Sequence, residues 1–198
     1  MAGIKDIPFD AARQVAEGVR SASAARRSCV RIAIEVDEGA PSALVCAIRD
    51  AFVPQTSTGL LHVAAFDAGA TVRVNPDCNA AIVVSGTSGA APSVAGAFCS
   101  AGVPAAIVVE SSVEVPVSTL PEGVEVIAGA TEATLLEKLA EWLAQACRAD
   151  VALGASFPFV RRAVCRRCVR ARSLQNAVIG FLPFGSGAAL PLMTANQM

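Results

Sequence analysis

Two stretches of five consecutive apolar residues, 80–84 and 105–109, constrain the fold of this 198-residue chain more than any other feature. A strand without a polar position has no side that can face water, so both of its faces must be covered. Strands of this kind occur in parallel sheets that carry helices on both sides. The two stretches therefore predict the centre of a parallel α/β sheet.

The rest of the chain alternates between strand-like and helix-like patterns around these two segments. Strands are predicted over three further apolar or β-branched segments and one short one, namely 30–36, 60–66, 124–127 and 72–74. Helices are predicted where apolar residues recur at helical spacing, at about 9–25, 41–52, 90–101 and 131–147. This alternation predicts an α/β fold with a doubly wound, mainly parallel, Rossmann-like sheet, followed by a basic helical tail.

Charge is distributed unevenly along the chain. Residues 1–156 contain all 17 acidic residues and 10 basic ones, a net charge of −7, whereas residues 157–198 contain six arginines and no acid. We expect an α/β domain over 1–150 and a basic, then apolar tail over 151–198, whose partner is an anionic membrane surface, an acidic face of another protein or the acidic body of this chain. The arginines expected to make this contact are Arg161, Arg162, Arg166, Arg167, Arg170 and Arg172.

The composition disfavours several classes of protein. With 54% hydrophobic residues and a net charge of −1, the chain is not intrinsically disordered. An acidic body with few aromatic residues near its basic ones argues against a nucleic-acid partner. Residues 1–9 lack the apolar core of a secretory signal, and seven scattered cysteines fit reduced thiols that mostly pack in the core. The uncharged stretch 177–193 is too short and too broken for a secure membrane span.

The element order resembles a small bacterial GTPase of the Era type whose nucleotide motifs have been lost. The turn 37–42 stands where the phosphate loop would lie, but it has no lysine, and Pro41 removes one N–H donor. The segment 66–69 is similar to a shortened Asp-x-x-Gly switch motif. After Val109, Glu-Ser-Ser-Val replaces the Asn-Lys-x-Asp that reads guanine. The resemblance, over about residues 29–147, implies a degenerate P-loop-type domain.

The tail carries a second resemblance. Residues 172–185 and 194–198 resemble the opening of a membrane-associated domain that often follows Era-like GTPase domains in bacteria. This resemblance implies that the chain contains only the beginning of such a domain. The two resemblances imply the same architecture, a GTPase-like domain joined to a membrane-associated one.

Candidate ligand-binding residues gather at the expected carboxyl ends of the strands, where ligands bind in open α/β sheets. The turn 37–42 and the loop 85–89 offer backbone N–H groups, hydroxyls and carboxylates next to helix starts. The candidates are Asp37, Gly39, Ser42, Asp67, Ser85, Gly86, Thr87 and Ser88. For both segments, an ordinary turn or flexible loop is the favoured interpretation.

Two other features suggest chemistry less strongly. Cys165 and Cys168 form a Cys-x-x-Cys pair, but a structural zinc site needs four ligands and no second pair accompanies them, so we expect no metal site. His62 is the only histidine, and a Gly-x-Ser-x-Gly hydrolase motif fails at Ala90. We therefore expect a structural histidine and no catalytic residue.

These patterns favour a non-enzymatic protein without a cofactor. The leading interpretation is a pseudo-GTPase-like scaffold or sensor module, cytoplasmic and peripheral to the inner face of the membrane. The alternative is a small-molecule or nucleotide-binding Rossmann-like domain, with its ligand at the carboxyl ends of the strands. The sequence leaves the oligomeric state open.

Overall fold

The computed structural model of the chain describes residues 17, 20, 23–69, 72–110 and 120–181. Contacts divide the chain into two compact units, one of residues 28–164 and one of residues 1–27 and 165–198. The first unit holds the sheet and the helices that cover it. In the second unit, the described residues are helical at 17, 20 and 23–26 and along the helix that continues past residue 164.

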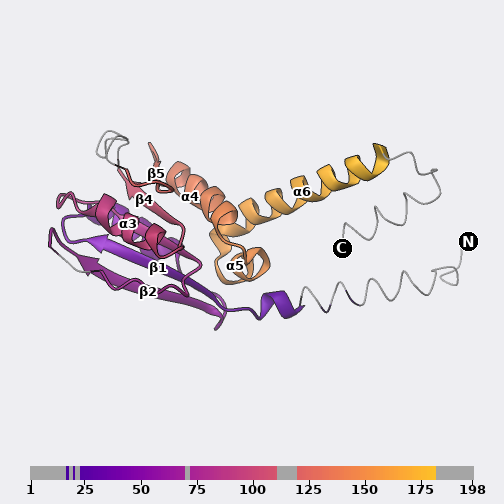
Figure 1. Cartoon of the computed structure of the whole chain (residues 1–198), viewed down its shortest axis with the longest axis horizontal. Helices are drawn as coiled ribbons and strands as arrows, with labels where there is room; N and C mark the ends of the chain where they lie inside the picture. The colour runs from indigo at the N-terminus through magenta and orange to yellow at the C-terminus, as the bar shows by residue number, and fades with distance from the viewer. Residues whose placement is uncertain (1–16, 18–19, 21–22, 70–71, 111–119, 182–198) are drawn as a thin grey trace, which may run out of the picture. The chain divides into compact units, whose positions relative to one another are not determined.

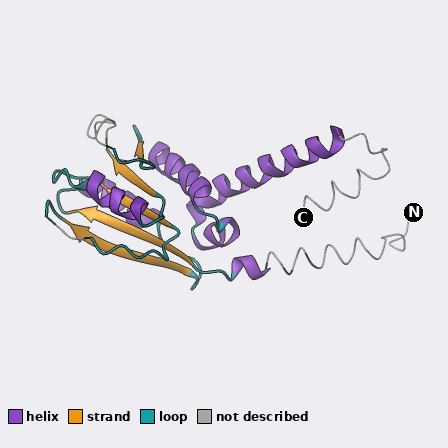
Figure 2. Cartoon of the chain, viewed as in Figure 1, coloured by secondary structure: helices purple, strands orange, loops and turns teal. Residues whose placement is uncertain are grey.

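Five parallel strands form one sheet in the order β2-β1-β3-β4-β5. Figure 2 shows the strands of this sheet in orange. The strands are β1 (Val30–Asp37), β2 (Gly59–Phe66), β3 (Ala80–Val84), β4 (Ala105–Val109) and β5 (Glu125–Ala128). This order is one of the two common arrangements of doubly wound α/β sheets. The predicted α/β fold with a parallel, Rossmann-like sheet is confirmed.

The strands β3 and β4 have the same sequence, Ala-Ala-Ile-Val-Val, and every residue of both is buried. Side chains of alternate residues enter two separate cores, one on each face of the sheet. At about 25 cal/mol per Å² of buried apolar surface, such doubly covered strands contribute strongly to stability. They occupy the third and fourth positions of the sheet, as their lack of a polar face predicts.

Helices cover both faces of the sheet (Figure 1). The helices are α2 (Ser42–Ala51), α3 (Ala91–Ser100), α4 (Glu132–Ala146), α5 (Asp150–Ser156), the 3-10 helix η3 (Pro158–Val160) and α6 (Arg161–Phe181). On one face, Val94, Ala95 and Phe98 of α3 pack on the sheet. On the other face, α2, α4, α5 and η3 supply the core.

Two helix ends follow from local chemistry. Thr131 caps α4, because its hydroxyl accepts the Thr134 N–H at 3.3 Å while the Thr134 hydroxyl accepts the Thr131 N–H at 3.1 Å. Gly102 follows the end of α3 with φ of +79°, a conformation that favours glycine. Both ends lie within a residue or two of the positions that the sequence predicts.

The prediction of a short strand at 72–74 is wrong. The described residues 72–79 form an irregular connection from β2 to β3, without a helix. Val72 and Val74 still pack against the core on the α3 side of the sheet, which explains their apolar alternation. Most of the helix predicted at about 9–25 lies outside the described residues.

The packed core extends beyond the boundary that the sequence suggests at residue 150. Leu153, Phe157 and Val160 are fully buried against the sheet, and the Phe157 ring lies 5.5 Å from that of Phe52. The contacts that define the sheet unit continue to Val164 in the first turn of α6. Residues 150–164 therefore complete the core rather than begin the tail.

Candidate functional site

The candidate site lies where the loops that follow β1 and β3 meet. These neighbouring strands lead in opposite directions, since β1 continues to the edge strand β2 and β3 continues to β4. Such a switch point is where open α/β sheets bind their ligands. The structure brings five of the eight candidate residues together here: Asp37, Gly39, Gly86, Thr87 and Ser88.

The Asp37 side chain joins the two loops. Its Oδ1 accepts a hydrogen bond from the Gly39 N–H at 2.8 Å, within its own turn. Its Oδ2 accepts from the Ser88 N–H at 3.3 Å and from the Ser88 hydroxyl, 51 residues along the chain. Only 2% of Asp37 is exposed, so these hydrogen bonds compensate a buried carboxylate.

Two glycines allow the loops to approach so closely. A Cβ atom at Gly39 would overlap the Thr87 hydroxyl, and one at Gly86 would overlap the backbone of the 37–40 turn and lie 2.7 Å from Asp37 Cγ. The Ala40 N–H also bonds to the Asp37 carbonyl at 2.9 Å. The two loops are thus packed against each other through their backbones.

The other three candidates do not join this cluster. Ser42 is exposed at the start of α2, and Ser85 is buried with its N–H donated to the Val108 carbonyl at 2.9 Å. Asp67 is exposed after β2, where its Oδ1 accepts the Gly69 N–H at 3.1 Å. Asp67 and Asp37 therefore follow neighbouring strands but have different surroundings.

The backbone N–H groups of these two loops bind an anion that the protein itself supplies, the carboxylate of Asp37. A phosphate loop presents free backbone N–H groups to its ligand. Here the N–H groups of Gly39, Ala40 and Ser88 already have intramolecular acceptors, all of them on Asp37: its two carboxylate oxygens and its backbone carbonyl. A phosphate would have to displace a buried carboxylate that is covalently fixed in place.

A second pair of polar side chains, Glu35 on β1 and His62 on β2, was not recognised in the sequence. Glu35 is buried on the α3 side of β1, and burial raises the pKa of its carboxyl, an effect that the nearby His62 opposes. His62 is exposed on β2 rather than packed in the core, because the described residues of the β2–β3 connection form no helix that could cover it. Only the strand register, which pairs His62 with Ala33, brings the two together.

His62 also lines a shallow cavity of about 490 Å³ near the start of β1 and β2. Its lining residues are Arg31, Leu60, Leu61, His62, Arg73, Val74, Asn75 and Pro76. Arg31 forms an ion pair with Asp77 at 3.6 Å, so part of its positive charge is already compensated. The cavity combines apolar and basic groups without a buried polar side chain aimed into it.

The arginines predicted to contact a partner lie along α6. Arg162, Arg167 and Arg170 are exposed and Arg166 is partly exposed, whereas the Arg172 side chain lies outside the described residues. Arg161 has a structural role, since its guanidinium donates to the Gly154 carbonyl and to Gln55 Oε1, both at 2.8 Å. It therefore fixes the end of α5.

Most of the cysteines do not pack in the core as the sequence predicts. Cys78 and Cys147 are buried, but Cys29, Cys46, Cys165 and Cys168 are exposed. Burial raises the pKa of the Cys78 thiol. Within the described ranges, no group of three or more histidine, cysteine or acidic side chains is placed to hold a metal ion.

Comparison with known proteins adds no family to this description. A scan of family models, a search of curated proteins and a search of solved structures each gave no match. Among the helices of the described segments, none is long and apolar enough to cross a bilayer.

Proposed function

We propose that the chain is a non-catalytic, pseudo-GTPase-like module that serves as a scaffold or sensor. The observation that carries this proposal is the Asp37 carboxylate, which accepts the N–H groups of Gly39 and Ser88 at the switch point. In a working phosphate loop, such groups bind the phosphate. Here the loops are completed by the protein's own anion, so the fold keeps its shape without a nucleotide.

Electrostatics supports the same proposal. The segments 37–42 and 85–90 contain two acidic residues, Asp37 and Glu38, and no lysine or arginine. Two like unit charges 4 Å apart repel by about 4 kcal/mol at an effective dielectric constant of about 20. A triphosphate carries several such charges and would find no compensating cation on these loops. This repulsion therefore exceeds the favourable free energy that hydrogen bonds from a few backbone N–H groups would contribute.

Titration calorimetry with GTP, GDP and ATP, each with Mg²⁺, tests this proposal. We expect no binding tighter than a Kd of about 1 mM, which corresponds to about −4 kcal/mol. The Asp37→Asn variant tests the cause, because it removes one of the two acidic charges on these loops without adding a lysine, and any nucleotide binding should then be tighter than in the wild-type chain. A micromolar Kd for any of these nucleotides would refute the pseudo-GTPase proposal and favour the alternative of a nucleotide-binding Rossmann-like domain.

We further propose that the module acts at the cytoplasmic face of a membrane through α6. Arg162, Arg167 and Arg170 are exposed on this helix, and no acidic residue follows Asp150 in the chain. Basic residues held near an anionic bilayer each contribute about 1 kcal/mol of binding. Three such residues give a reversible attachment that depends on salt.

Sedimentation with vesicles tests this attachment. Wild-type protein should sediment with phosphatidylglycerol vesicles and not with phosphatidylcholine vesicles. Reversing two charges in Arg162→Glu/Arg170→Glu should reduce binding by about tenfold or more, since about 1 kcal/mol is lost for each arginine. The control Arg26→Glu/Arg27→Glu makes the same change of net charge at two exposed arginines outside α6. Equal losses in both double variants would contradict a role for α6.

A further inference from the structure

The β2 strand forms one edge of the sheet and pairs with β1 alone. On its outer side, the backbone N–H and C=O groups have no partner strand within the described part of the chain. None of its eight residues is charged and none is proline. Four of them, Leu60, His62, Val63 and Ala65, are exposed. A long, apolar edge strand of this kind is a template for pairing with another chain.

The opposite edge of the sheet is protected. The β5 strand has only four residues and begins with the exposed, charged Glu125. Short length and charge are two ways in which natural proteins prevent edge strands from pairing. The sheet therefore has one edge that can accept a strand and one that resists it.

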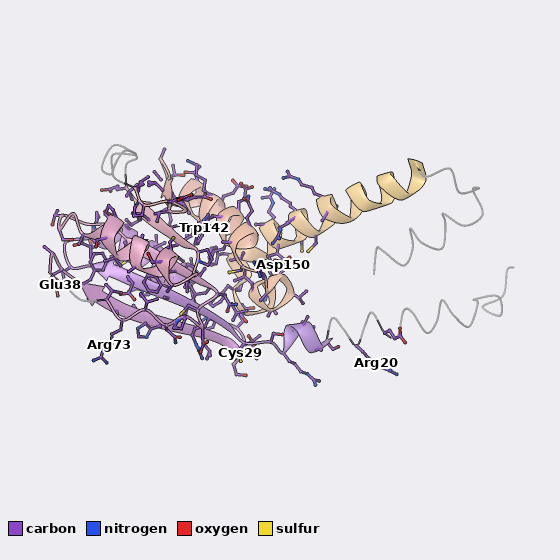
Figure 3. All side chains as sticks on the ribbon, viewed as in Figure 1. Arg20, Cys29, Glu38, Arg73, Trp142 and Asp150 are labelled. Atoms are coloured by element: carbon purple, nitrogen blue, oxygen red, sulfur yellow. The ribbon has the colours of Figure 1, made fainter. Side chains whose placement is uncertain are left out.

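The connection 72–79 leaves the outer edge of β2 unpaired. Val72 and Val74 pack into the core on the α3 side of the sheet, so this connection covers a face of the sheet. Its described backbone hydrogen bonds are internal or go to Arg31 of β1, and none joins it to β2. Figure 3 shows the Arg73 side chain pointing away from the ribbon.

We propose that β2 pairs antiparallel with β2 of a second copy, with Val63 on the two-fold axis. This register places Leu61 opposite Ala65 of the other copy, and Leu60 opposite Phe66. His62 then faces Ala64, whereas a register centred on His62 would place two imidazoles against each other. Val63, which is 61% exposed in the single chain, is covered by its own symmetry mate.

Self-complementarity and closure favour a second copy over another partner. The strand carries no charge for a charged peptide to recognise, while its own sequence supplies the apolar pairs Val63–Val63, Leu61–Ala65 and Leu60–Phe66. In the dimer, the β2 edges of the two copies pair with each other. Only the protected β5 edges then remain, at the two ends of a ten-stranded sheet. The association therefore stops at a closed dimer and does not continue as a filament.

Light scattering coupled to gel filtration tests the dimer on the full chain. Over about 1–100 µM, the range where a small interface of this kind dissociates, the mass should rise from the 20.1 kDa of one chain to twice that value. Val63→Lys places two like charges on the axis and should raise the dissociation constant by about tenfold or more. Ala65→Lys, at a second exposed position of the same strand, should also weaken the dimer.

The matched control is Val53→Lys. Val53 is 60% exposed, nearly the same as Val63, but lies outside β2, in the connection that follows α2. This variant should keep the wild-type dissociation constant, and circular dichroism should show all three variants folded. A wild-type chain that stays at 20.1 kDa at the highest concentration would overturn the proposal. So would an equal effect of Val53→Lys and Val63→Lys, or a mass that rises beyond the dimer.

Discussion

Asp37→Ala should lower the free energy of unfolding by about 2–4 kcal/mol, because it removes a buried carboxylate that accepts three hydrogen bonds from Gly39 and Ser88. The loops that follow β1 and β3 lose the side chain that joins them. Urea denaturation at neutral pH measures the loss. The fluorescence of Trp142, the chain's only tryptophan and buried in α4, reports the transition.

Two further variants show whether this effect belongs to the loop junction. Asp67→Ala removes an aspartate that follows the neighbouring strand but is exposed and accepts one hydrogen bond, so its cost should stay within about 1 kcal/mol. Asp37→Asn should have an intermediate effect, because its amide oxygen can still accept the Gly39 N–H. If Asp37→Ala cost no more than Asp67→Ala, the junction would not stabilise the fold.

The fold was predictable where the sequence contains a signal that only one arrangement satisfies. The segments 80–84 and 105–109 have no polar position, so they could only be central strands. Thr131 before a periodic apolar segment marks the start of α4 in the same way. The segment 72–74 misled because alternation reports which side chains are buried, and an irregular chain can bury them as well as a strand.

The candidate site was predictable in its location but not in its internal arrangement. Strand order brings the ends of β1 and β3 together, and glycine, serine and aspartate residues at those ends mark the loops. The sequence does not reveal that Asp37 accepts from Ser88, because that contact joins residues 51 positions apart. It also depends on the absence of side chains at Gly39 and Gly86, which lets the two backbones meet.

The extent of the core was underestimated for a related reason. Residues 150–164 come after the alternating strands and helices and include the first two of the six tail arginines, so the sequence assigns them to the tail. Their burial depends on a space beside α2 and α4 that only the assembled sheet creates. Phe157 fills this space together with Phe52, whose ring also lies 4.9 Å from that of Phe159.

Phe157→Ala should therefore destabilise the sheet domain by about 3–5 kcal/mol, the usual cost of removing a fully buried phenylalanine. Urea denaturation followed through Trp142 measures this cost in the full chain. Val151→Ala is the matched control, because Val151 lies in the preceding helix α5 but is 41% exposed, and its effect should stay within about 1 kcal/mol. A small loss for Phe157→Ala would mean that the domain ends near residue 150 and that the following helices are an appendage. A large loss would make α5 and η3 part of the folding unit, so that a chain ending at residue 150 would expose the aromatic core around Phe52.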